Sequence, residues 1–259
     1  MENSASNIRP CALITGSSRG IGRAIAVRFA KCGTDVAVNY SREGGKSESA
    51  AKALVEEFKS LGVNAVSIKA DISKKDEVKY LIAETISNLG RLDYLILNAA
   101  KAPFKPIEKL FERELTDLVR TNYMGNIFCV QEALPHLEAA GGKIVFISSL
   151  GSKYYNASYP LGSMKAAMEA VVRDLSETLS KRGISVNAVS GGIVKTDSFK
   201  VLRQYVEGLD VMPESFFVTP DELADVVYFL CSDQSRGISG QTIVVDRGMS
   251  NSLFRNFTK

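Results

Sequence analysis

The sequence has no tryptophan, a single histidine, four cysteines and no long uninterrupted apolar run. A membrane-spanning helix needs about 18–20 consecutive apolar residues, so the pattern predicts no membrane span. Residues 1–9 are polar and lack the apolar segment of a secretory signal. We therefore expect a cytoplasmic protein without membrane contacts.

The cysteines and charged residues also lack the spacings that are typical of disulfide, metal or nucleic-acid sites. The cysteines lie in apolar runs and form no CxxC pair, which predicts buried free thiols in a reducing compartment; they are Cys11, Cys32, Cys129 and Cys231. No group of His, Cys and carboxylate residues has metal-ligand spacing, so no metal is predicted. The net charge of +3 is dispersed and no basic run alternates with aromatics, which argues against nucleic-acid binding.

What the sequence does contain is a regular alternation of short apolar runs and longer amphipathic segments. Strands are predicted at 11–16, 35–40, 64–70, 92–98, 142–149, 184–190 and 241–246, and helices near 20–32, 45–60, 74–89, 107–139, 158–182 and 220–232. The strands are apolar nearly throughout, as expected where helices cover both sheet faces. We expect an α/β fold in one domain over 1–259, with a doubly wound, Rossmann-like parallel sheet of about seven strands.

The least regular stretch is 192–219, between the sixth strand and a helix that begins with Thr219-Pro220-Asp221-Glu222. Proline suits the first helical position, so this tetrapeptide predicts a helix start. Ligands of open parallel sheets bind outside the carboxyl ends of the strands. We therefore expect this insertion to cover a substrate, with an apolar wall from Leu202, Tyr205, Phe216 and Phe217; a plain surface loop is the alternative.

A glycine-rich stretch, ITGSSRGIG (14–22), follows the first strand and opens the first helix. Gly16 permits a tight turn, Gly20 lets the backbone approach a phosphate, and Gly22 lets helix and strand pack closely. Free N–H groups at the helix start would meet a pyrophosphate. The stretch predicts a dinucleotide site.

Charge at the end of the second strand predicts which dinucleotide binds. A carboxylate there would bind a ribose 2′-OH and repel a 2′-phosphate, whereas this chain has Ser41 and Arg42 and no carboxylate before Glu43. Arg19 in the glycine loop adds a second cation. NADPH is favoured over NADH, with a solvated Arg42 as the alternative, and Asp71 after the third strand is placed to contact the adenine.

Together these residues resemble the short-chain dehydrogenase/reductase superfamily, from about residue 11 to residue 248. The matching pieces are TGSSRGIG, Asp71, NAA (98–100), Asn122 in RTNYMGN, ISS ending at Ser149, Lys165, NAVSGG with Thr196, and GQTIVVDRG. The resemblance implies hydride transfer, with Lys165 on the nicotinamide ribose and Asn122 holding the water chain behind it. The cofactor contacts that it implies are Gly16, Ser18, Arg19, Gly20, Ile21, Gly22, Ser41, Arg42, Asp71, Ile72, Asn98, Lys165, Gly192 and Thr196.

The chain departs from the usual pattern at Leu161. Most members have tyrosine four residues before the lysine, where both side chains share one helix face, and a leucine cannot donate a proton. The enoyl-acyl carrier protein reductases carry an apolar residue there and their tyrosine seven before the lysine. Here Tyr159 is six before Lys165, and Pro160 fits the first helical position, leaving Tyr159 at the cap. We expect Tyr159 to be the acid; Tyr155, or no tyrosine at all, are the alternatives.

The resemblance implies reduction of a 2-enoyl thioester, possibly on an acyl carrier protein, in fatty acid or polyketide synthesis. Tyr159 would hydrogen-bond the developing enolate, Lys165 would lower the pKa of its phenol, and Ser149 would line the site. One alternative is an atypical 3-oxoacyl or secondary-metabolism ketoreductase; the other is a cofactor-binding, non-catalytic partner subunit. Surplus apolar residues in the 107–139 and 158–182 helices further predict a homodimer or homotetramer.

Overall fold

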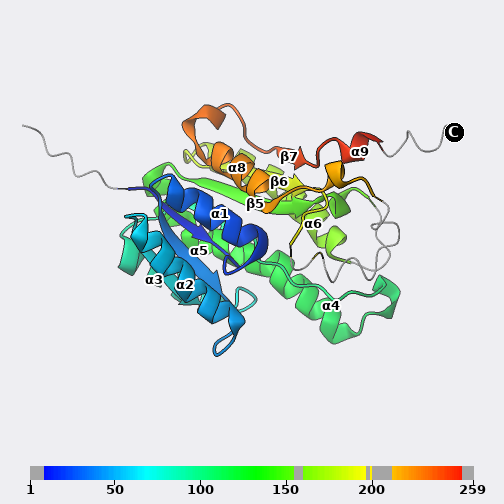
Figure 1. The fold of residues 1–259 in the computed structure, drawn as a ribbon, viewed down its shortest axis with the longest axis horizontal. Coiled ribbons are helices and arrows are strands. Elements are labelled where there is room, and N and C mark those ends of the chain that lie inside the picture. Colours follow the sequence, from blue (N-terminus) through cyan, green and yellow to red (C-terminus); the bar gives the residue numbers. More distant parts are fainter. Residues whose placement is uncertain (1–8, 155–159, 197–198, 200–211, 253–259) are drawn as a thin grey trace, which may run out of the picture.

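A single seven-stranded parallel sheet forms the centre of the computed structural model, which describes residues 9–154, 160–196, 199 and 212–252 (Figure 1). The strands are β1 (Cys11–Ile14), β2 (Asp35–Tyr40), β3 (Ala65–Lys69), β4 (Tyr94–Leu97), β5 (Lys143–Ser149), β6 (Ser185–Gly191) and β7 (Thr242–Val245). Their order is β3-β2-β1-β4-β5-β6-β7. The predicted doubly wound parallel sheet is confirmed.

The order of the strands reverses between β1 and β4, which are paired through Ala12 with Tyr94 and Ile14 with Ile96. The chain first builds outward from β1 through β2 to β3, then returns to the other side of β1 with β4. In such sheets the ligand crevice lies outside the carboxyl ends of the strands at this reversal. The loops after β1 and β4 therefore define the place where a site is expected.

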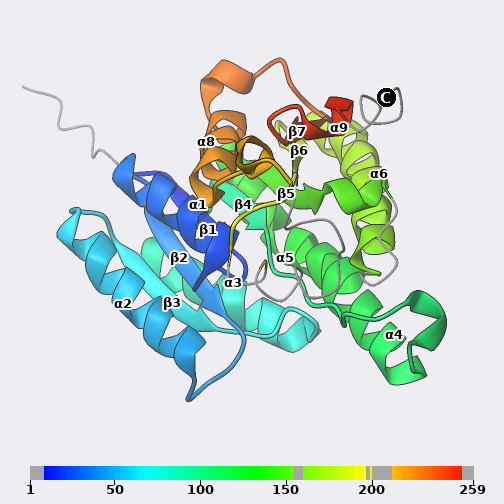
Figure 2. The same ribbon diagram turned by 45° about the vertical axis from the view of Figure 1, so that its right-hand side comes forward.

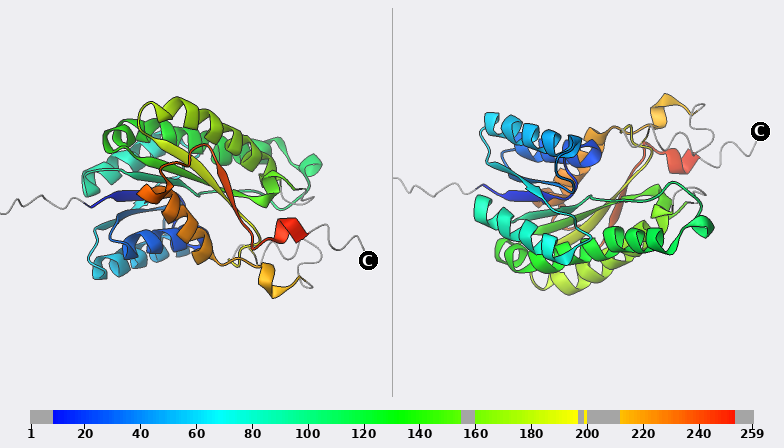
Figure 3. Two further views of the ribbon diagram at one scale, coloured as in Figure 1. Left: turned by 90° about the horizontal axis from the view of Figure 1, so that it is seen from above. Right: turned by 90° about the horizontal axis from the view of Figure 1, so that it is seen from below.

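Helices cover both faces of the sheet, as Figure 3 shows in its two views. On one face lie α1 (Gly20–Lys31), α2 (Lys46–Ser60) and α8 (Pro220–Cys231), and on the other α3 (Lys75–Leu89), α5 (Gly125–Ala140) and α6 (Leu161–Ser180). Each layer buries its own apolar cluster against the sheet, centred on Phe29 and Phe58 in the first and on Leu95 and Phe146 in the second. Strands that are buried on both faces explain the continuous apolar runs of the sequence.

The helix predicted over 107–139 is interrupted. It is replaced by a short turn η1 (Ile107–Lys109), α4 (Glu112–Val119), a π-helical turn η2 (Arg120–Met124) and α5. Leu110 and Phe111 are extended, with ψ of 134° and 154°, so the first turn cannot continue into α4. Figure 2 shows α4 reaching away from the sheet beyond α5. Apolar periodicity alone did not separate these pieces.

Two smaller expectations about the helices and thiols were wrong, and one was confirmed. Pro160 is the N-cap of α6 rather than its first residue, which is Leu161. Cys32 is exposed, because it lies just past the end of α1, whereas the other three cysteines are buried. As predicted, α8 starts at the tetrapeptide 219–222 with Pro220 as its first residue; the structure adds that Thr219 is the N-cap and that Glu222 completes a capping box.

The remaining features concern the insertion and the chain ends. Segment 192–219 is described only in part: Leu202 and Tyr205 lie outside the described residues, while Phe217 is buried and stacks edge-on against Phe199. The last described helix is α9 (Met249–Ser252). Among the described helices, none combines the length and apolarity that a bilayer crossing requires.

Candidate active site

The glycine loop turns tightly at the carboxyl end of β1. Gly16 and Gly20 have φ of +64° and +57°, in the left-handed region that favours glycine. A Cβ at Gly22 would lie 2.5 Å from Asn98 Nδ2 and 2.6 Å from the carbonyl oxygen of Gly16. The loop is therefore pressed against the segment after β4, and side chains are excluded from the cradle that it forms.

Polar side chains of neighbouring strands hold this loop in place. Asn98 Nδ2 donates to the carbonyl oxygens of Thr15 and Gly16 at 2.9 and 3.2 Å. Asn39, in β2, accepts from the Gly16 N–H at 3.0 Å, and Ser17 Oγ accepts from the Asn39 N–H at 3.0 Å. Asn98 was expected at the site; Asn39 and Ser17 were not. The signal for Asn39 was a polar residue inside an otherwise apolar strand.

Helix α1 starts at the glycine loop and points its free N–H groups at the cradle. Its first turn, which is fully described, carries no acidic side chain, so the positive end of the helix dipole is unopposed. Its N-cap Arg19 is exposed, as are Ser41 and Arg42 after β2, while Ser18 is buried. The donors and cations at this end fit a phosphate-bearing dinucleotide.

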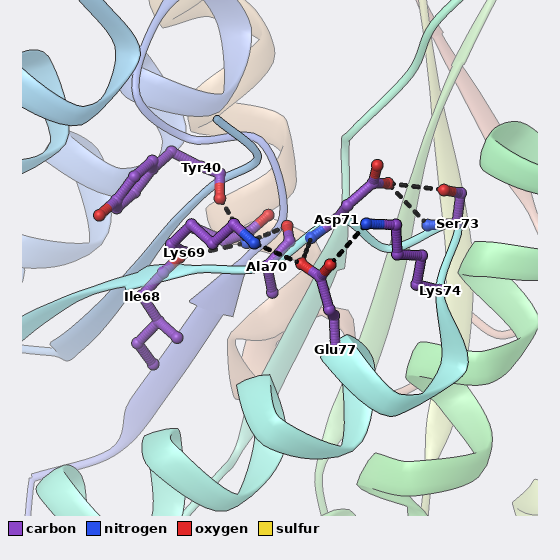
Figure 4. Close-up of polar contacts among 9 residues, drawn as sticks. Tyr40, Ile68, Lys69, Ala70, Asp71, Ser73, Lys74 and Glu77 are labelled. Carbon is purple, nitrogen blue, oxygen red and sulfur yellow. Dashed lines mark hydrogen bonds and ion pairs between the residues drawn. The ribbon is translucent and has the colours of Figure 1, made fainter. Parts of the chain in front are cut away.

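Asp71 lies where β3 ends, in a compact polar cluster (Figure 4). Its Oδ1 accepts from the N–H and hydroxyl of Ser73 at 3.0 and 2.8 Å. Its own N–H donates to Glu77 Oε2 at 2.8 Å, and Lys69 and Lys74 also bind that carboxylate. Burial opposes ionisation, but the hydrogen bonds from Lys74, Asp71 and Lys69 prevail and lower the pKa of Glu77 to about 2. Glu77 thereby fixes the backbone of Asp71, and sequence reasoning missed it.

The segment after β6 lies beside the glycine loop. A Cβ at Gly20 would lie 3.7 Å from Thr196 Cγ2, so the loop and Thr196 are neighbours although 176 positions separate them in the chain. Gly192 lies against Asp246, whose Cβ would be 2.9 Å from a Cβ at Gly192. Ile21 is half-buried and Ile72 is buried. The expected cofactor residues of both halves thus line one edge of the sheet.

Lys165, in the second turn of α6, is a buried cation at the carboxyl end of β5. Its side chain is 5% exposed, Nζ donates to the carbonyl oxygen of Ile147 at 2.5 Å and lies 4.6 Å from the ring centre of Phe146. Burial lowers the pKa of Lys165 to about 8, while the negative charge of Glu169 opposes that change. A group with this pKa is still mostly charged at pH 7.

Asn122 occupies the π-helical turn η2, a feature often found at functional sites. Its side-chain amide donates to the carbonyl oxygens of Lys101 and Leu118 and accepts from the Lys101 N–H. Its own carbonyl oxygen accepts from Asn126 Nδ2 at 2.7 Å. In this structure Asn122 ties the segment after β4 to the start of α5, a role that its sequence context did not reveal.

The remaining expected residues surround the start of α6. Ser149 is half-buried at the last position of β5, and Leu161 is 4% exposed at the first position of α6. The start of α6 packs closely against the turn after β5, since a Cβ at Gly162 would lie 2.2 Å from the Gly151 carbonyl oxygen. Tyr155 and Tyr159 lie outside the described residues. A hydrocarbon therefore fills the helix position one turn before Lys165.

The arrangement can hold a dinucleotide along the edge where β1, β4, β5 and β6 end, with a buried ammonium at its β5 end. The glycine cradle, the unopposed α1 terminus and the exposed arginines fit the phosphates. Lys165 fits a hydroxyl-bearing ribose and a polarised reacting oxygen. Across the described ranges, His, Cys and carboxylate side chains do not gather in threes that could hold a metal.

Comparison with known proteins gives one family model and relatives of nearly full length. The model described as "Enoyl-(Acyl carrier protein) reductase" matches residues 16–250. The 3-oxoacyl-[acyl-carrier-protein] reductase FabG of Staphylococcus aureus is 37% identical, over 92% of this chain and 97% of its own. The 1-cyclohexenylcarbonyl-CoA reductase of Streptomyces collinus is also 37% identical, over 93% of this chain and 87% of its own.

Solved structures give the same result for the fold. A 7α-hydroxysteroid dehydrogenase, in complex with NADH and 7-oxo glycochenodeoxycholic acid, superposes with a TM-score of 0.83 at 30% identity, covering 96% of this chain and 98% of its own. A dehydrogenase/reductase from Sinorhizobium meliloti superposes with a TM-score of 0.81 at 28% identity, covering 92% and 94%.

Proposed function

Since the chain belongs to the short-chain dehydrogenase/reductase superfamily and is an oxidoreductase, we propose that it reduces an acyl thioester with NADPH. The observation that carries the proposal is Lys165, a buried ammonium at the β5 end of a glycine-lined dinucleotide cradle. When bound, NADPH supplies the hydride. The relatives named above are reductases or dehydrogenases, which favours catalysis over a non-catalytic partner subunit.

The choice of NADPH over NADH rests on charge. A related dehydrogenase binds NADH, which supports a nicotinamide cofactor in general. In this chain Arg42 and Arg19 are exposed cations beside the expected position of the adenosine ribose, and Ser41 stands where a carboxylate would repel a 2′-phosphate. Both arginines can bind that phosphate through paired N–H groups.

As substrate we place the 3-oxoacyl thioester first, which reverses the order that the sequence suggested. The FabG relatives are named for 3-oxoacyl-[acyl-carrier-protein] reduction and match nearly the whole chain. In this reaction negative charge develops on the 3-oxygen, and a hydrogen-bond donor near Lys165 stabilises it. The same names support an acyl carrier protein as the carrier.

A 2-enoyl thioester is the second candidate, and a specific observation favours it. Leu161 fills the place one turn before Lys165 and cannot donate a proton to a ketone oxygen. The matching family model is described as an enoyl reductase, and the relative from Streptomyces collinus is named for a cyclohexenyl thioester. There the charge develops on the thioester oxygen, so the donor must reach a different atom.

Both candidates need a donor, and we assign that role to Tyr159, with Tyr155 as the alternative. Tyr159 directly precedes Pro160, the N-cap of α6, and a residue ahead of a helix cap need not follow the helical period. Lys165 would lower the pKa of its phenol, Ser149 would line the pocket, and Asn122 would support Lys165 through water. Segment 192–219 would cover the acyl chain.

One assay tests the proposal and ranks the two substrates. Purified protein is mixed with NADPH and either acetoacetyl-CoA or crotonyl-CoA, and the loss of 340 nm absorbance is followed for each. We expect turnover with at least one thioester, and faster turnover with the 3-oxo compound. Faster turnover with crotonyl-CoA would reverse the ranking. If NADPH is consumed with neither thioester and with no longer acyl chain, the proposed function is refuted.

A further inference from the structure

Glu169 is a buried carboxylate that the proposed mechanism does not use. Glu169 is 7% exposed and lies one helical turn after Lys165, so the two side chains are neighbours on one face of α6. Ser148, in β5 and 4% exposed, donates its hydroxyl to Glu169 Oε1 at 2.5 Å. A carboxylate is costly to bury unless it is paired and hydrogen-bonded. Here Ser148 supplies the hydrogen bond, and Lys165, one turn earlier on α6, supplies a nearby positive charge.

The same two elements are joined a second time through Lys165. Its Nζ donates to the carbonyl oxygen of Ile147, the residue that directly precedes Ser148 in β5. Two consecutive residues of β5 are thus bound by two residues one turn apart on α6. The ammonium of Lys165 and the carboxylate of Glu169 therefore bind consecutive positions of β5, directly before Ser149.

We propose that Glu169, held by Ser148, is a positioning residue that keeps Lys165 charged and directed along the carboxyl end of β5. The inference rests on the proposed function, because it assigns to Glu169 the support of the lysine that would bind the cofactor. Glu169 touches no reacting atom in this assignment. It acts only through Lys165.

The charge balance around Lys165 supports this assignment. Burial lowers the pKa of Lys165, and the negative charge of Glu169 is the influence that raises it. Without Glu169, burial would act unopposed and the ammonium would lose its proton at a lower pH. A neutral Lys165 could still fit the space but would no longer supply a positive charge to the site.

Other charged groups pack around α6 but do not share this role. The pKa of Lys165 is changed by burial and by the charge of Glu169 alone. Several other titratable side chains lie on elements that contact or adjoin α6, namely β5, η2, α4 and the two residues after the short turn η3 (Leu150–Ser152). They are Lys143, Arg120, Tyr123, Glu112, Arg113, Glu114, Asp117, Lys153 and Tyr154. β6 contributes none. Arg173 donates to the main-chain carbonyl oxygen of Glu169, not to its carboxylate.

The direct test is the titration of Lys165 in the cofactor-free protein. Lysine side chains are labelled with 13C and 15N, the Lys165 signal is assigned by its loss in a Lys165→Met variant, and its pH midpoint is measured by NMR. In Glu169→Gln, which keeps the shape and loses the charge, we expect the midpoint to fall by about one pH unit or more. The matched control is Glu177→Gln, the same change at an exposed position of the same helix, which should leave the midpoint unchanged.

Two further variants separate charge from hydrogen bonding and guard against a misfolded Glu169→Gln. Ser148→Ala removes the hydroxyl, so the midpoint should fall by less than in Glu169→Gln. Glu169→Asp retains the charge, so its midpoint should lie between those of the parent and of Glu169→Gln. A Lys165 midpoint equal to that of the parent in all three variants would overturn the proposal, even if the variants were less stable, because a merely structural role changes stability alone.

NADPH affinity gives a second readout that requires no substrate. In the parent, the dissociation constant measured by NADPH fluorescence should rise as the pH increases through the Lys165 midpoint. In Glu169→Gln that rise should begin at a correspondingly lower pH; an unshifted profile would contradict the proposal. If the thioester assay fails while these midpoints move, the proposed substrate is wrong and the role of Glu169 stands.

Discussion

Gly22 and Lys165 mark the two ends of the candidate site, and the chain builds these ends in different ways. At Gly22 the requirement is an absent side chain, since even a methyl group would meet Asn98 and the Gly16 carbonyl oxygen. At Lys165 the requirement is a side chain that is costly to bury and is kept by the Ile147 carbonyl oxygen and the charge of Glu169. The proposed nucleotide end is defined by backbone geometry, and the proposed nicotinamide end by buried charge.

The two ends should tolerate different kinds of substitution. Backbone geometry is shared by every chain that binds a dinucleotide in this way, so it identifies the cofactor class but not the reaction. Buried charge responds to single side chains and to pH. Specificity for the acyl substrate should therefore change with substitutions near α6, while substitutions near α1 should affect cofactor binding and stability.

The largest effect is expected from Lys165→Met, which removes the ammonium while keeping much of the side-chain length. Turnover should fall by about a thousandfold, within the range for losing an acid–base or electrostatic group. The measurement is kcat/KM for NADPH-dependent thioester reduction, with circular dichroism to confirm folding. Parental turnover in this variant would show that the buried charge of Lys165 is not needed for the reaction.

The same pair of proteins should reveal the cost of burying Lys165. Its folded pKa is about 8 and its ordinary value 10.5, so between these pH values the unfolded chain holds a proton that the folded chain has lost. The cost of burying the charged lysine is present in full below about pH 8 and disappears as the pH rises to about 10.5. Over this window the free energy of unfolding should therefore increase by up to about 3 kcal/mol.

The gain is measured as the free energy of unfolding of the parent minus that of Lys165→Met, determined with urea across this pH window. The subtraction removes the opposite trend from buried thiols and Tyr94, whose pKa values are raised by burial. A flat difference between pH 8 and 10.5 would show that Lys165 is not desolvated as the structure indicates.

At the nucleotide end, Gly22→Ala should lower the free energy of unfolding by about 1–3 kcal/mol, because its methyl group overlaps backbone atoms. NADPH binding should weaken by about tenfold or more, since the loop that forms the cradle must shift to make room for the methyl group. Chemical denaturation and NADPH fluorescence measure the two effects. Gly237→Ala is the matched control: a Cβ there would have no described atom within 4 Å, and both quantities should stay near the parental values.

The smallest effect is expected from Arg42→Ala, which tests whether a charged side chain also contributes at the proposed nucleotide end. NADPH affinity should fall by about tenfold, the worth of one charge-assisted hydrogen bond, and NADH affinity should not change. Titration with each nucleotide measures the ratio. The exposed Arg236 supplies the control, because Arg236→Ala should change neither affinity; equal losses for NADPH and NADH in Arg42→Ala would refute the 2′-phosphate assignment.

The sequence was sufficient for the strands, the sheet and the glycine cradle, because these follow from apolar runs and from residues such as Gly16 and Gly20 that serve one conformation. It was insufficient where a side chain acts through tertiary contacts. Glu77 and Asn39 gave no spacing signal, since their partners come from other elements. Glu169 is four residues after Lys165, but its burial and its bond to Ser148 in β5 could not be read from that spacing. The break before α4 was missed because extended residues at 110–111 do not disturb an apolar period.

The most direct test of the account is the replacement of Tyr159 by phenylalanine. The proposed chemistry needs a hydroxyl donor near Lys165, and Leu161, at the first position of α6, has no hydroxyl. We predict that kcat/KM for thioester reduction falls by at least about a hundredfold in Tyr159→Phe. NADPH affinity should be unchanged, and Tyr154→Phe, an exposed tyrosine, should remain as active as the parent. Parental turnover in Tyr159→Phe would contradict the account.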